Sequence, residues 1–157
     1  MIKNLFIIIF FAFFITAAYS AESEGHDGPP PAKNYKLGYK ELKRAKKLEK
    51  KGKIEKANKR YEKAFEYLIK SNKETPNQPD TLNYLGYTSR KLGNFEVAEK
   101  YYLEGLKIKP DHKGINEYLG ELYIKTNRID LAKQRLVVLE ACNCEEYDEL
   151  KELIDNN

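Results

Sequence analysis

Apolar and small residues recur along the second half of the chain in a pattern that repeats after 34 positions. Leu85, Gly86 and Ser89 stand at positions i, i+1 and i+4, which places them on one face of a helix. The same spacing recurs 34 residues later, beginning at Leu119. A fixed period of this length is typical of proteins built from stacked supersecondary units.

A second helical stripe follows each of these faces after a short turn. In the earlier copy the stripe comprises Ala98, Tyr102 and Gly105, and the turn contains Gly93 and Asn94. Gly93 can adopt the positive φ that ends a helix, and Asn94 is a residue type that caps the next one. Each copy is therefore expected to form an antiparallel helical hairpin, in which glycine in the first helix allows close approach of a second.

Both copies resemble the tetratricopeptide repeat, in the run Leu82, Leu85, Gly86, Ala98, Tyr102 and Pro110 and in its equivalent from Asn116 to Cys144. We expect repeats at 79–112 and 113–144. Such hairpins need neighbours to bury their apolar faces. The resemblance implies an all-α solenoid that binds other proteins and is not an enzyme.

A weaker copy occupies residues 38–71 and carries Gly52, Ala57 and Tyr61 at the pattern's positions. Glu41 and Arg44 replace large apolar residues, so we expect its first helix to face water on that side, as in a terminal capping repeat. Residues 145–155 combine Tyr147, Leu150 and Ile154 with many acids and predict a capping helix. The domain should then span 38–157 and contain seven helices.

The resemblance also implies where a ligand would bind. In this family the first helix of each repeat lines a concave groove, and exposed positions on it select a protein or peptide. In this sequence these positions are Asn83, Tyr87, Arg90, Lys91, Glu117, Glu121 and Lys125, and Lys46 and Lys50 would extend the groove's positive strip. Arg90 and Lys91 are expected to be able to hold a carboxylate.

The N-terminus has a different character. An apolar run from Leu5 to Ile15 follows Lys3, and the small residues Ala18 and Ser20 suit cleavage after Ser20. Residues 1–20 therefore predict a secretory signal peptide, and with it a periplasmic or secreted protein. Residues 21–37, with three consecutive prolines, are expected to form a disordered tether.

Charge is distributed unevenly. The whole chain has a net charge of +4, but residues 33–73 contain 16 basic and 5 acidic residues, whereas residues 74–157 contain 11 basic and 16 acidic ones. One alternative function is therefore electrostatic binding to an anionic envelope or membrane surface through the basic half. Nucleic acid is not expected as a partner, because export argues against it.

Cys142 and Cys144 are the only cysteines, and three interpretations stay open for them: a structural bridge, a redox-active pair, or bonds to a partner. A thiol–disulfide protein is thus a second alternative function. His26 and His112 stand apart from any other ligand residues, and the sequence has no phosphate-binding or hydrolase motif. We expect no metal, no cofactor and no catalytic residue; the oligomeric state is left open.

Overall fold

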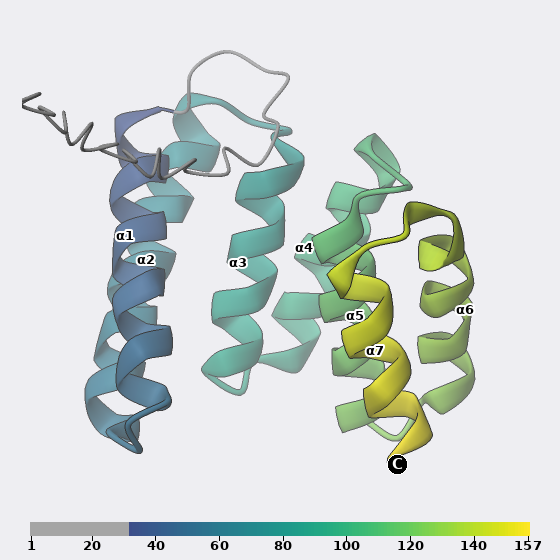
Figure 1. Cartoon of the computed structure of the whole chain (residues 1–157). Helices are drawn as coiled ribbons and strands as arrows, with labels where there is room; N and C mark the ends of the chain where they lie inside the picture. Colours follow the sequence, from purple (N-terminus) through teal and green to yellow (C-terminus); the bar gives the residue numbers. More distant parts are fainter. Residues whose placement is uncertain (1–31) are drawn as a thin grey trace, which may run out of the picture.

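A computed structural model describes residues 32–157 and shows seven α-helices in this range (Figure 1). They pair in chain order as three hairpins and a final helix: α1 (Lys33–Glu49) with α2 (Ile54–Glu74), α3 (Pro79–Lys91) with α4 (Phe95–Ile108), α5 (Lys113–Lys125) with α6 (Ile129–Leu139), and then α7 (Glu145–Asp155). A short 3-10 turn, η1 (Glu140–Cys142), connects α6 to α7. The expected fold class and the number of helices are confirmed. No helix within residues 32–157 is long and apolar enough to cross a membrane.

Each hairpin turns at a residue with positive φ. Gly52 has φ +68°, Gly93 has φ +85° and Asn127 has φ +59°. Gly93 and Asn127 are 34 positions apart, so the turn follows the repeat. Asn94 stands at the N-cap of α4, as expected, but its side chain accepts no capping hydrogen bond there.

The core lies within and between the hairpins and depends on glycines that face bulky side chains. A Cβ placed on Gly86 would lie 2.4 Å from the ring of Tyr102 on α4, and Tyr102 is fully buried. Gly120 plays the same part in α5, but the side chain over it is Leu150 of α7 rather than a residue of α6. The capping helix therefore packs directly on the first helix of the last repeat.

The first repeat differs from the sequence-based expectation at two places. Helix α1 begins at Lys33, four residues before the expected end of the tether at 37, because Tyr35 packs against Tyr84 with ring centroids 6.0 Å apart. Glu41 does not face water: it is 8% exposed, and Arg60 of α2 donates to its carboxylate at 2.8 Å. The predicted signal peptide lies outside the described residues.

Glu41 is tolerated inside this hairpin because two guanidinium groups enclose it. Arg44 donates from the next turn of α1 at 2.5 Å, in addition to Arg60. Burial by itself would raise the pKa of Glu41, but the hydrogen bonds from Arg60 and Arg44 outweigh it and hold the pKa below its usual value. An ion cluster therefore replaces the apolar residue that the repeat pattern calls for.

Candidate functional site

The first helices of the three hairpins and the capping helix together enclose a cavity of about 340 Å³, called the central cavity below. All the residues that line it come from α1, α3, α5 or α7, except Lys50, which directly follows α1: Lys46, Glu49, Lys50, Tyr87, Arg90, Lys91, Glu117, Tyr118, Glu121 and Glu149. Helices α2, α4 and α6 contribute none. The cavity thus lies on the side of the stack where the resemblance places a ligand.

Two tyrosines and a lysine form the centre of this cavity. The rings of Tyr87 and Tyr118 have centroids 4.9 Å apart, and Lys46 Nζ lies 4.6 Å from the first and 5.6 Å from the second. Lys46 Nζ also donates to the Tyr118 hydroxyl at 3.4 Å. Burial lowers the pKa of Lys46, and the nearby carboxylates of Glu121 and Glu149 offset part of that effect. An ammonium group is thus held between aromatic faces.

Two of the other three cations of the central cavity, Arg90 and Lys91, already have partners. Arg90 donates to Glu121 at 2.6 Å, with an Arg90 side chain only 9% exposed. Lys91 pairs with Glu49 at 2.5 Å, and Glu49 also accepts a hydrogen bond from Tyr61 at 2.7 Å. The expectation that Arg90 and Lys91 can hold a carboxylate stays a prediction, and a ligand carboxylate would have to compete with Glu121 and Glu49 for them.

Glu117 is the most unusual group of the site. Its residue is 4% exposed, and no Lys, Arg or His side chain of the described residues forms an ion pair with it. Burial, a hydrogen bond with Glu149 and the charges of Glu121 and Glu146 raise the pKa of Glu117 to about 9. At neutral pH Glu117 therefore carries a proton.

A second cavity, of about 410 Å³, shares Glu117 and Tyr118 with the central one. Its other lining residues are Asp80, Asn83, Tyr84, Lys109, Asp111, His112, Lys113, Gly114 and Glu146. Asn83 is 5% exposed, and its Oδ1 has no hydrogen-bond partner. The two cavities adjoin at one buried carboxyl group and one tyrosine ring.

His112 has a structural role at the edge of the second cavity. Its Nδ1 accepts a hydrogen bond from the backbone N–H of Ile115 at 3.2 Å, which caps α5. The other ring nitrogen, Nε2, then carries the proton and lies 3.0 Å from Asp80 Oδ1. The side chain is 12% exposed. The described residues contain no cluster of three His, Cys, Asp or Glu side chains suited to a metal ion.

The structure brings most of the nine expected groove residues together. Seven line the central cavity, and Asn83 lines the second one with Glu117. Lys125 lies outside both, and its Nζ is 5.9 Å from the ring of Phe95. Asn83, Tyr87 and Glu117 are buried and not exposed, because neighbouring first helices converge on them.

Sequence reasoning missed three residues of the central cavity: Tyr118, Glu49 and Glu149. Tyr118 had a signal, since it follows Tyr84 by one repeat and Tyr84 also lines the second cavity. Glu149 had none, because it belongs to the capping helix and has no counterpart in the repeats. Glu49 lines the central cavity because it forms an ion pair with Lys91 of the next repeat.

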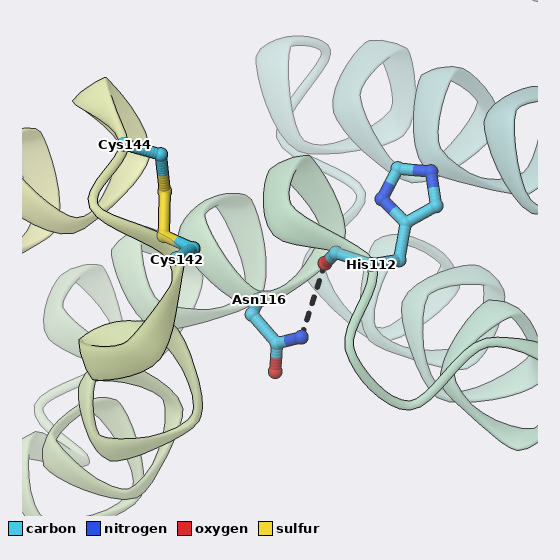
Figure 2. The surroundings of a disulfide bond; sticks show 4 residues. All are labelled: His112, Asn116, Cys142 and Cys144. Carbon is cyan, nitrogen blue, oxygen red and sulfur yellow. Dashed lines mark hydrogen bonds between the residues drawn. A yellow bond between two sulfur atoms is a disulfide. The ribbon is translucent and has the colours of Figure 1, made fainter. Parts of the chain in front are cut away.

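The two cysteines lie at the far end of the stack, where η1 leads into α7, and a disulfide joins them (Figure 2). Their Cα atoms are 5.2 Å apart, and Asn143 between them has φ +45°. In the same region Asn116 is fully buried and donates to the backbone oxygen of His112 at 3.0 Å (Figure 2). Neither cysteine lines either cavity.

Comparison with known proteins agrees with this architecture. The family model described as tetratricopeptide repeat matches residues 79–112, which are α3, α4 and the turn that follows. The chain contains a tetratricopeptide repeat and has the tetratricopeptide-repeat fold. A TPR repeat-containing protein of Pseudomonas aeruginosa is 34% identical to it over 62 residues, which are 40% of this chain. The chain spans about a tenth of that relative's length.

Solved tetratricopeptide-repeat structures resemble this one over most of its length. The first TPR of Spaghetti (RPAP3), bound to the HSP90 peptide SRMEEVD, is 19% identical with a TM-score of 0.55, covering 78% of this chain and 94% of that one. The translocator chaperone SycD of Yersinia enterocolitica is 16% identical with a TM-score of 0.56, covering 77% and 88%. The second TPR domain of human RPAP3, in complex with the HSP70 peptide SGPTIEEVD, is 18% identical with a TM-score of 0.53, covering 76% and 97%. These likenesses show that the chain has the fold of tetratricopeptide-repeat proteins.

Proposed function

We propose that this tetratricopeptide-repeat protein is an exported, non-catalytic scaffold that binds a peptide segment of another protein along α1, α3, α5 and α7. The observation that carries the proposal is the central cavity. Four helices from four successive units converge there on two tyrosines and several charged groups. Tyrosine offers a large apolar contact area together with a polar hydroxyl, a combination that is enriched in binding sites.

Related structures support a peptide as the partner. The two RPAP3 domains hold short peptides, and SycD acts as a chaperone. Both cavities here open on the side of the stack formed by the first helices, and they share Glu117 and Tyr118. We infer that they form one groove, long enough for an extended segment of several residues.

Binding to the groove is tested by selection from a random library of 12-residue peptides against the purified protein. The expected result is a set of peptides whose binding is lost in Tyr118→Ala and in the double variant Tyr87→Ala/Arg90→Glu. The matched control is Leu103→Ala on α4, a side chain 41% exposed and away from both cavities. Peptides that bind all these variants equally would place the binding surface elsewhere.

Export is tested separately. When the complete chain is produced in a bacterium with a periplasm, the mature protein should appear in the periplasmic or secreted fraction. Its N-terminal sequence should begin at Ala21, which follows the expected cleavage position. Retention in the cytoplasm with residues 1–20 intact would contradict the proposal of an exported protein and would leave the peptide groove unaffected.

A further inference from the structure

The wall between the two cavities consists of groups that accept hydrogen bonds. Glu117 lines both cavities, is 4% exposed and has no cationic partner within ion-pair distance in the described part of the chain. Asn83 is 5% exposed on the facing helix α3, and its Oδ1 accepts no hydrogen bond. The Oδ1 of Asn83 is a buried acceptor without a donor, which is costly, so this wall is suited to a group rich in N–H donors.

The protein already holds such a donor on the other side of Tyr118. Lys46 Nζ lies over Tyr87 and Tyr118 and is attracted by the carboxylates of Glu121 and Glu149. This internal ammonium shows which chemistry the centre of the groove accommodates. The second cavity has the same kinds of lining groups, with Tyr84 and Tyr118 as aromatic side chains and Glu117 and Glu146 as carboxyl groups. The lysines of the second cavity, Lys109 and Lys113, are exposed at the ends of α4 and α5.

We propose that the second cavity binds a cationic side chain, lysine or arginine, of the partner peptide, with Asn83, Glu117 and Glu146 as acceptors and Tyr118 as the aromatic face. The inference rests on the proposed function and names the chemistry of its ligand. The proposed ligand differs from the peptides in the related complexes, SRMEEVD and SGPTIEEVD, which are rich in acidic residues. In this protein two of the four cations of the central cavity, Arg90 and Lys91, are paired internally.

Binding of a cation should release a proton. The pKa of Glu117 is raised to about 9, so the group is protonated at neutral pH and must ionise to pair with a cation. Affinity for the peptide should therefore increase with pH, by up to about tenfold per unit between pH 6 and 8, because one proton is lost per peptide bound. Besides tyrosines, the titratable groups that line a cavity together with Glu117 are Lys46 and Glu49 on α1, Lys50 after it, Asp80, Arg90 and Lys91 on α3, Glu121 on α5, Glu146 and Glu149 on α7, and Lys109, Asp111, His112 and Lys113 at the rim.

The experiment uses peptides selected from the random 12-residue library that depend on Tyr118 for binding. Their sequences should contain lysine or arginine at one common position. Replacement of that residue by glutamine should weaken binding about tenfold or more, as expected for a lost hydrogen-bonded charge. The affinity measured by calorimetry should rise from pH 6 to pH 8, and binding should release a proton. In Glu117→Gln the affinity should no longer depend on pH, and no proton should be released.

Two further variants keep the result interpretable. Glu146→Gln alters a partly exposed acceptor of the same cavity and should weaken binding even if Glu117→Gln fails to fold. Glu96→Gln, exposed on α4, should leave both affinity and its pH dependence unchanged. Groove-dependent peptides that share an acidic residue, or whose affinity does not change with pH, would overturn the inference and leave the peptide groove standing. If no peptide depends on Tyr118, the proposed function and the inference both fail.

Discussion

At the residue scale, the repeat pattern correctly predicts several of the side chains that line the groove. It does not predict how buried they are or which residues they pair with. Positions 83, 87 and 117 follow from the helical period, and the structure locates all three at the cavities. Their burial does not follow, because it arises from the convergence of helices far apart in sequence. The partners of Arg90 and Lys91 belong to other repeats for the same reason.

Glu117 should reduce the stability of the protein at neutral and alkaline pH. Its pKa is raised from 4.5 to about 9 in the folded state, so the folded protein keeps a proton that the unfolded chain loses as the pH increases from about 4.5. The free energy of unfolding should consequently fall as the pH rises through this window. Glu117→Gln retains the shape without the charge, and it should raise the stability at pH 8 by roughly 1–2 kcal/mol.

Thermal unfolding measured by circular dichroism between pH 5 and pH 9 checks this. The two proteins should melt at similar temperatures at pH 5 and diverge as the pH increases. Glu96→Gln, on the outer helix α4, should follow the wild-type curve throughout. A Glu117→Gln protein that is less stable than wild type at pH 8 would mean that Glu117 is ionised and compensated in the free protein.

At the scale of elements, close packing at glycine explains why the hairpins could be predicted and the capping contact could not. Gly86 meets Tyr102 within its own repeat, so both partners appear in the 34-residue pattern. Gly120 has the same place in the next repeat, but its partner Leu150 lies beyond the last repeat, in α7. The repeat period carries no information on the helix that closes the stack.

The contact between Gly86 and Tyr102 gives a quantitative test of hairpin packing. A methyl group on Gly86 would overlap the Tyr102 ring, so Gly86→Ala should cost about 1–3 kcal/mol although alanine favours helices. Tyr102→Leu removes the ring and should lower the cost of the alanine in the double variant. Urea unfolding of the four proteins measures the coupling; strictly additive effects would contradict the packing described here.

The disulfide next to α7 is expected to be structural. It closes a very short loop, so its removal in Cys142→Ser/Cys144→Ser should cost only about 1–2 kcal/mol in an entropic account. Hydrogen exchange of the α7 amides should become faster, because the bridge fixes the start of that helix. Turnover of insulin disulfides by the wild-type protein, absent in the double serine variant, would instead support the thiol–disulfide alternative.

At the scale of the whole molecule, the stacking of hairpins was predictable from the sequence because each repeat carries the same local pattern and cannot bury its apolar face alone. The start of α1 was not, since it depends on the contact of Tyr35 with Tyr84 in the next repeat. The charge asymmetry was visible in the sequence. The structure adds that much of the basic charge lies on exposed positions of α1 and α2, away from the cavities.

Exposed lysines of the basic half should therefore contribute little to the affinity of the groove. Lys47 and Lys51 are exposed and line neither cavity. The double variant Lys47→Gln/Lys51→Gln should bind a groove-dependent peptide within about twofold of wild type, because isolated surface charges are screened by salt. Fluorescence anisotropy at 0.15 M salt measures this. A loss comparable to that of Tyr118→Ala would favour the electrostatic surface-binding alternative.

The most direct test of the central claim is hydrogen exchange of the protein with and without a saturating peptide from the random library. A peptide held by the first helices should slow exchange in α1, α3, α5 and α7, most strongly around Tyr87 and Tyr118, and leave α2, α4 and α6 unchanged. Protection confined to α2, α4 and α6, or to the basic ends of α1 and α2, would contradict it.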